Sequence, residues 1–143
     1  MGYATQQDLV DRFGAAEIVQ RTDRTNVPPS TIDAEVVTLA LDDATALIDS
    51  YLRKLYALPL STVPTVLTKS CADIARYFLW GEAADPKGPI ASAYRDALSW
   101  LGQVADGTVQ LEANGVPSPG AGDGARVQAS RPEMTRHNLR GWI

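Results

Sequence analysis

The most constraining feature of this sequence is a run of apolar side chains that recur at steps of three and four residues. The run consists of Val36, Val37, Ala40, Leu41, Ala44, Leu47, Ile48, Tyr51, Leu52 and Leu55. On an α-helix these steps place the side chains on one face. Ser30-Thr31-Ile32-Asp33, just before the run, has the form of an N-terminal capping box. The pattern therefore predicts a helix of about six turns that buries one face.

Two more long helices are predicted after this one. Leu58-Pro59-Leu60 cannot continue a helix, because Pro59 lacks the backbone N–H. We expect Ser61 or Thr62 to cap the next helix, with Pro64 near its first turn. Its apolar stripe is Leu67, Cys71, Ile74, Ala75, Phe78 and Leu79, and after a turn at residues 85–89 the last stripe is Ile90, Ala93, Tyr94, Ala97, Leu98, Leu101 and Val104, with Asp106-Gly107 as its C-terminal cap.

Two short helices precede the long ones. Thr5-Gln6-Gln7-Asp8 has the form of a capping box for a helix that carries Leu9 and Phe13 inward and ends at Gly14. A second short segment follows from Ala15 to Arg21. Three long and two short helices can share one core, so the sequence predicts a mainly α protein with a helical bundle domain over residues 1–113.

Residues 114–143 have a different character. Residues 114–124 include four Gly and two Pro, so residues 114–129 are predicted as a Gly/Pro-rich loop. Thr108–Leu111 alternates in polarity and is compatible with a strand that pairs with Arg126–Ala129 in a small β-hairpin. Residues 130–143 show no period, and we expect them to form an extended C-terminal interaction arm.

The sequence offers little chemistry for catalysis. The chain has one cysteine, Cys71, and one histidine, His137, which excludes an internal disulfide and a multi-cysteine zinc site. Cys71 lies on an apolar stripe and is interpreted as a core thiol, while His137 falls in the C-terminal arm. Trp80 and Trp100 lie next to core stripes, so packing is favoured over stacking on nucleic acid bases. We expect no catalytic, metal or cofactor site, and therefore no enzyme.

Acidic residues of the first long helix are predicted to face solvent, a partner or a channel. Asp42 and Asp43 are adjacent, so on a helix they point about 100° apart and do not form a catalytic pair. Asp49 lies two turns beyond Asp42. We interpret Asp42, Asp43 and Asp49 as an acidic partner or channel face.

Charge is divided between the bundle and the arm. Residues 1–113 contain nine basic and fifteen acidic side chains, a net charge of −6, whereas residues 114–143 carry four arginines against two acids, a net charge of +2. Thirty extended residues span up to about 100 Å, enough to reach another subunit. The predicted interface residues are Arg126, Arg131, Met134, Arg136, Leu139, Arg140, Trp142 and Ile143. The sequence leaves open whether they contact a partner or fold back over their own bundle.

Short motifs along nearly the whole chain resemble a Mu-like bacteriophage protein family that is encoded among head-morphogenesis genes. They are Tyr3-Ala4-Thr5, Asp8-Leu9, Arg12-Phe13-Gly14, Thr22-Asp23, Asp43-Ala44, Ile48-Asp49, Tyr51-Leu52, Leu58-Pro59-Leu60, Cys71–Leu79, Arg95-Asp96-Ala97, Trp100-Leu101, Thr135-Arg136 and Leu139-Arg140-Gly141. No single motif is diagnostic, but their order and spacing are fairly specific. The chain has Met134 where an aromatic is usual and Trp142 where Phe or Tyr is usual, and both departures keep an apolar anchor.

Such proteins resemble the head–tail connectors, or adaptors, of tailed phages. The resemblance implies a structural subunit of the virion neck, assembled in the host cytoplasm as a homo-oligomeric ring of typically twelve copies. The implied partners are other copies of the chain, the portal protein and a tail-side neck or tail terminator protein. DNA would pass through the ring without specific binding, and no membrane is involved. The alternative is a small helical DNA-binding or regulatory module that uses the basic arm, although the net charge of −4 argues against a duplex reader.

Overall fold

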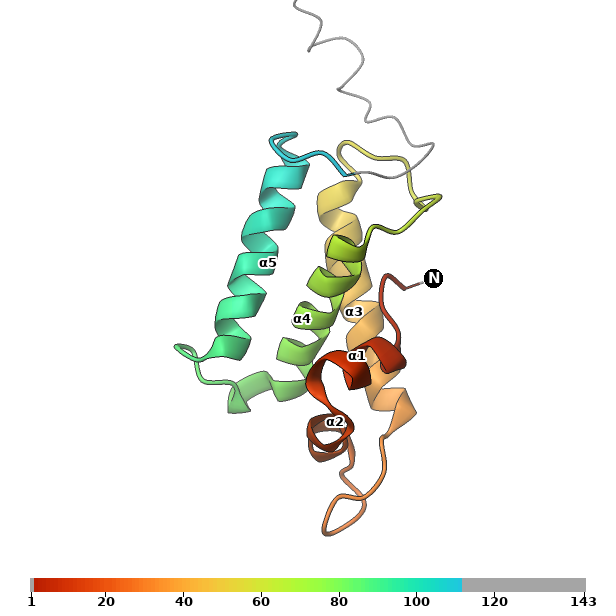
Figure 1. Ribbon diagram of the computed structural model, residues 1–143, viewed down its shortest axis with the longest axis vertical. Helices are drawn as coiled ribbons and strands as arrows, with labels where there is room; N and C mark the ends of the chain where they lie inside the picture. Colours follow the sequence, from red (N-terminus) through yellow and green to blue (C-terminus); the bar gives the residue numbers. More distant parts are fainter. Residues whose placement is uncertain (1, 112–143) are drawn as a thin grey trace, which may run out of the picture.

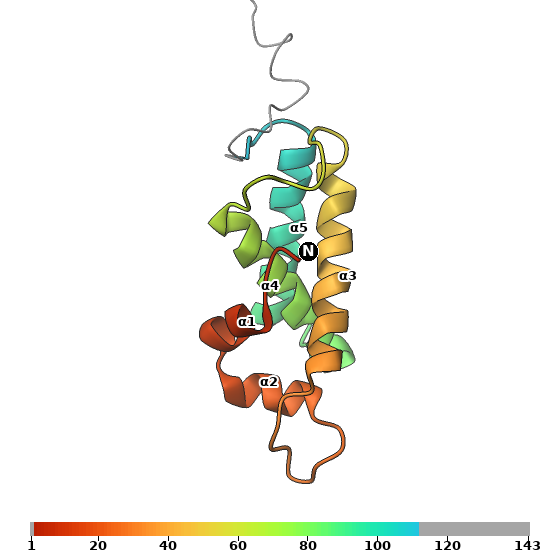
Figure 2. The ribbon, with the colours of Figure 1, turned by 90° about the vertical axis from the view of Figure 1, so that its right-hand side faces the viewer.

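The computed structural model describes residues 2–111, and these residues form a bundle of helices (Figure 1). The elements are α1 (Gln6–Phe13), α2 (Ala15–Thr22), α3 (Ala34–Leu52), α4 (Thr65–Trp80), a short 3₁₀ helix η1 (Gly81–Ala83) and α5 (Pro89–Ala105). The long helices α3, α4 and α5 lie side by side, and α1 and α2 pack at one end of them (Figures 1 and 2). The prediction of a mainly α bundle with three long and two short helices is confirmed.

Helix α4 is the centre of the core. It contacts all four other α-helices, and seven of its residues are buried, namely Leu67, Ser70, Cys71, Ala72, Asp73, Ile74 and Ala75. The largest apolar side chains packed around it are Leu9, Ile18, Val37, Ile48, Leu52, Leu101 and Val104, all at most 1% exposed. Because the predicted stripes of all three long helices meet here, burial of their apolar area is the main force that holds the bundle together.

The N-terminal caps were predicted with mixed success. The capping box at Thr5 and Asp8 is confirmed, with each side chain bonded to the other residue's backbone N–H. The box predicted over residues 30–33 is wrong, because Asp33 itself caps α3 and accepts from the N–H groups of Glu35 and Val36. Helix α3 therefore begins at Ala34 and has 19 residues.

The backbone N–H groups of Ser30 and Thr31 have a different acceptor. Both donate to Oδ2 of Asp23, at 2.9 and 3.1 Å, and the N–H groups of Thr25 and Asn26 donate to its Oδ1. These bonds, led by that of Ser30, hold the pKa of Asp23 well below its usual range. One buried carboxylate thus organises the loop that projects between α2 and α3 (Figure 2).

A proline precedes α4, and a glycine comes after the C-cap of α5. Pro64 occupies the N-cap of α4 and no side chain caps that helix, so the predicted cap at Ser61 or Thr62 is wrong. A proline is compatible with this place because the first N–H groups of a helix have no partner within it. Helix α5 ends at Ala105 with Asp106 as its C-cap, and Gly107 follows with a φ of 81°, as the sequence predicted.

Helices α1 and α2 are attached to α4 by an arginine. The guanidinium of Arg76 donates to both carboxylate oxygens of Glu17, at 2.8 and 2.6 Å, and lies 4.2 Å from the ring centre of Phe13. Nearby, the guanidinium of Arg21 stacks over Trp80 at 4.1 Å. Trp80 therefore packs within the bundle, as expected.

Residues 108–111 form no strand, which contradicts the first half of the predicted β-hairpin. Their backbone is bonded elsewhere, since Val109 N–H donates to the carbonyl of Gln103 and Leu111 N–H donates to the hydroxyl of Tyr56. Val109 and Leu111 also pack on the core. The predicted partner strand at residues 126–129, the domain boundary at residue 113 and the arm lie outside the described residues.

Candidate functional site

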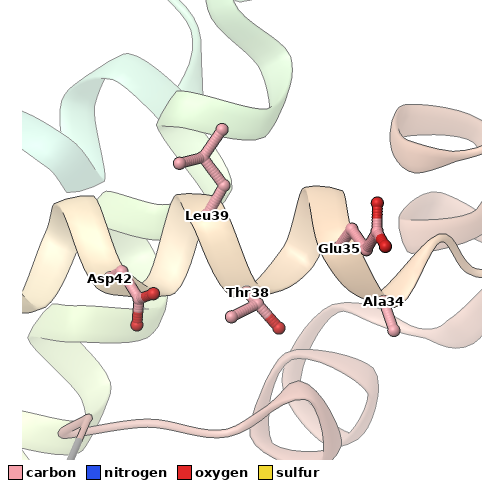
Figure 3. A pocket seen from close by; sticks show the side chains of 5 residues that line it. All are labelled: Ala34, Glu35, Thr38, Leu39 and Asp42. Carbon is pink, nitrogen blue, oxygen red and sulfur yellow. The ribbon is translucent and has the colours of Figure 1, made fainter.

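The outer face of α3 leaves a large apolar side chain uncovered. Leu39 is 63% exposed, although it lies between the buried residues Val37 and Ala40. At 100° per residue it points away from the stripe that those two share. Leu39 borders a shallow hollow of about 380 Å³, which is lined by Ala34, Glu35, Thr38, Leu39 and Asp42 (Figure 3).

The surroundings of Leu39 are acidic. Glu35, Asp42 and Asp43 are all exposed, and all three lie within about two turns of Leu39 on the same helix. The two ion pairs among residues 2–111 join Lys69 to Asp73 and Arg76 to Glu17, so neither neutralises this face. We call the surface formed by Glu35, Leu39, Asp42 and Asp43 the acidic α3 face. It combines an apolar centre with uncompensated negative charge.

Asp49, unlike Asp42 and Asp43, is only partly exposed to solvent. It is half-buried and accepts a hydrogen bond from the hydroxyl of Tyr3, which is buried. Burial and this bond raise the pKa of Tyr3. The structure thus leaves Asp42 and Asp43 open to solvent, as the sequence indicated, and uses Asp49 to fasten the N-terminal segment. That the acidic residues face a partner or a channel stays a prediction.

A second apolar depression lies between α4 and α5 at the opposite end of the bundle. It is lined by Pro64, Thr65, Val66, Trp100, Val109, Gln110 and Leu111. Val66 is 50% exposed, and Trp100 is half-buried against the core. An adjoining hollow adds Lys69, Asp73 and Asp96. We call this surface the α4–α5 groove, and its rim carries both signs of charge.

Cys71 is a core thiol, as predicted. It is fully buried, and its Sγ lies 3.9 Å from the hydroxyl of Thr45. Burial raises the pKa of the thiol to about 11, so it stays protonated at neutral pH and is a poor nucleophile. Within residues 2–111, no three His, Cys, Asp or Glu side chains are grouped to hold a metal ion.

The predicted arm residues, and His137, lie outside the described residues. Of the predicted interface residues, the structure therefore locates Asp42, Asp43 and Asp49. It adds Leu39 and Val66, which the sequence reading missed. A signal for both was present, because each is a large apolar residue that falls off the helical stripe of its neighbours.

Comparison with known proteins supplies the context of these surfaces. The profile of the family described as Bacteriophage Mu, Gp36 matches residues 3–129. The chain belongs to this family. It is 35% identical to "Gene product J" of Escherichia phage Mu over 138 residues, which cover 95% of this chain and 96% of that protein. It is 32% identical to "Mu-like prophage FluMu protein gp36" of Haemophilus influenzae, over 99% of this chain and 98% of that one.

Membership of the Mu Gp36 family confirms the resemblance to Mu-like phage proteins. The matches run along nearly the full length of both relatives, so the bundle and the C-terminal residues are both part of the similarity. No helix among the described residues has the length and apolar character needed to cross a membrane.

Proposed function

We propose that this protein is a structural head–tail connector subunit of a tailed bacteriophage, without enzymatic activity. It assembles with other copies into a ring, of twelve subunits by analogy with the connectors it resembles. The ring lies in the virion neck between the portal protein and a tail-side neck or tail terminator protein, and DNA passes through it. The observation that carries this proposal is the uncovered acidic α3 face on a protein of a Mu phage family.

The exposure of Leu39 supports an assembly role. A solvent-exposed leucine by itself is ordinary on a protein surface. Here it lies at the edge of a hollow, on the longest helix, with the exposed carboxylates of Glu35, Asp42 and Asp43 within about one turn and no cation paired to them among residues 2–111. Such a surface fits a protein partner that brings apolar and basic side chains together.

The charge distribution supports passage of DNA without specific binding. The bundle has an excess of acidic side chains, with fifteen against nine basic ones over residues 1–113. Negative charge repels phosphate, so an acidic surface opposes the electrostatic attraction that drives non-specific DNA binding.

The test is assembly of the full-length protein with its portal. We expect ring-shaped particles in negative-stain images and a shift to a larger species in sedimentation velocity. Deletion of residues 130–143 is expected to weaken assembly while the helical circular dichroism signal is retained, because the helices lie within residues 6–105. Equal assembly of the truncated and full-length proteins on the portal would refute the role of the arm, and absence of any portal complex would refute the connector.

The alternative, a small helical DNA-binding or regulatory module, makes the opposite prediction in a gel-shift assay. Binding through Arg126, Arg131, Arg136 and Arg140 would give an affinity that falls steeply as salt is raised. A connector would show no such complex at physiological salt. The assay therefore separates the two functions without knowledge of the partners.

A further inference from the structure

We infer that the acidic α3 face of one subunit is the docking site for the C-terminal arm, residues 130–143, of a neighbouring copy. This inference rests on the proposed connector function and names the contact that joins one subunit to the next. Leu39 is the apolar centre of the site, and Glu35, Asp42 and Asp43 receive the arginines of the arm. Its partner is thus a second copy of this chain.

The chemistry of the arm complements that of the site. The C-terminal residues 130–143 contain Arg131, Arg136 and Arg140 against one acid, Glu133. They also contain the apolar side chains of Met134, Leu139, Trp142 and Ile143. An apolar contact at Leu39 removes hydrocarbon from water on both partners. Arginine binds carboxylates with two parallel hydrogen bonds and is favoured at protein interfaces.

The alternative site on the bundle, the α4–α5 groove, matches the arm less well. Its rim holds Lys69, which already pairs with Asp73 at 2.8 Å. Asp96 is the remaining acid that lines this region. The acidic α3 face instead offers three exposed carboxylates, and no lysine or arginine lines its hollow. Charge complementarity therefore selects α3 over the groove.

The last described residue and the site lie at different ends of the bundle, which is compatible with a contact between copies. Leu111, the last described residue, bonds to Tyr56 beyond the C-terminal end of α3. Leu39 lies in the second turn of α3, thirteen residues before Leu52, which is about 20 Å along the helix. The described chain therefore ends at one end of the bundle (Figure 1), and the site lies towards the other end. Contacts between two different surfaces of identical subunits join them head to tail, and such a chain of subunits forms a ring when the rotation between neighbours closes.

The first experiment compares two exposed apolar residues by the same substitution. Leu39→Glu places a like charge in the proposed site, and Val66→Glu places one in the α4–α5 groove as the matched control. A fluorescent peptide of residues 130–143 is titrated against the wild-type and the two variant proteins, each truncated after residue 129. We expect at least about tenfold weaker binding with Leu39→Glu and wild-type affinity with Val66→Glu. Equal binding to all three proteins, or none to the wild type, overturns the inference.

A charge swap tests which groups meet. Asp42→Lys together with Asp43→Lys in the truncated receptor is expected to weaken binding of the wild-type peptide and to restore binding of a peptide with Arg136→Glu and Arg140→Glu. Circular dichroism checks that each receptor is folded, which is expected because Asp42 and Asp43 are exposed. If the swapped peptide shows no preference for the swapped receptor, the assignment of the arginines to this face is wrong.

Crosslinking in the full chain distinguishes a neighbour from the same molecule. A variant with Leu39→Cys and Leu139→Cys is oxidised and separated on a denaturing gel. A ladder of covalent oligomers supports the inference, while an intramolecular disulfide or no disulfide overturns it. These outcomes are separate from the connector proposal: loss of portal rings with an intact arm contact would refute the connector alone, and rings that survive Leu39→Glu would refute this contact alone.

Discussion

The guanidinium of Arg76 on α4 binds the carboxylate of Glu17 on α2 through two hydrogen bonds, and both side chains are about four-fifths buried. The two residues are 59 positions apart in the chain. The same guanidinium lies over the ring of Phe13 on α1. One arginine thus fixes both short helices to the centre of the bundle.

Removal of the charge on Glu17 is expected to destabilise the fold. Glu17→Gln keeps the size of the side chain but replaces two charge-assisted hydrogen bonds, so we expect the free energy of unfolding to fall by about 1.5–3 kcal/mol. Urea denaturation measures this loss. The exposed Glu82 provides the control, and Glu82→Gln should change the free energy of unfolding by less than about 0.5 kcal/mol. Equal effects of the two substitutions would show that the Arg76 contact contributes nothing.

The Asp23 loop is expected to make stability depend on acid pH. The folded pKa of Asp23 lies below its unfolded value of about 3.9. Its contribution to stability is therefore fully present above that value and is lost as the pH falls through the folded pKa. We expect Asp23→Asn to be less stable than the wild type at pH 7, and the gap to narrow as the pH falls below 4.

Urea denaturation of both proteins at pH 7, 4 and 2.5 measures this gap. Asp96→Asn is the control, because Asp96 is an exposed carboxylate on the surface of α5. A gap between wild type and Asp23→Asn that stays constant over this range would contradict the role given to the Asp23 carboxylate.

Cys71 is expected to resist alkylation in the folded protein. With a pKa of about 11, about one thiol in a thousand is ionised at pH 8, against about one in four for a free cysteine. Burial also blocks access to the sulfur. The rate of reaction with iodoacetamide at pH 8 should rise more than about a hundredfold when urea unfolds the chain. Similar rates in the folded and unfolded protein would show that the thiol is accessible.

Two leucines that differ in exposure should respond differently to the same change. Leu101→Ala creates a cavity at a fully buried position and is expected to cost about 2–5 kcal/mol of unfolding free energy. Leu39→Ala removes an exposed side chain and should cost less than about 1 kcal/mol in the isolated subunit. Thermal or urea unfolding of the two variants provides the measurement. A large loss for Leu39→Ala would mean that Leu39 supports the fold of its own subunit.

Local patterns determined the helices because each helical turn places residues three and four apart on one face. The stripe from Val37 to Leu52 and the box at Thr5 and Asp8 needed no other part of the chain. The start of α3 was harder to predict, because Asp23, which lies outside the predicted box, accepts from the N–H of Ser30 that the box would have used and from the N–H of Thr31. Residues 108–111 were wrongly predicted as a strand because their partner is also remote in sequence. The N–H of Leu111 donates to the hydroxyl of Tyr56, which takes the place of a carbonyl in a partner strand.

The amino-acid sequence by itself determined the five α-helices, their core-facing stripes and the acidic character of the bundle, because periodicity and charge are local properties. Only the tertiary structure decided which acids stay open to solvent. The hydroxyl of Tyr3, 46 positions away in the chain, donates a hydrogen bond to Asp49. Asp42 and Asp43 receive no such contact from residues 2–111 and stay exposed. It also decided that no described helix covers Leu39. Such outcomes depend on which distant segments pack together, and no local pattern of residues encodes that choice.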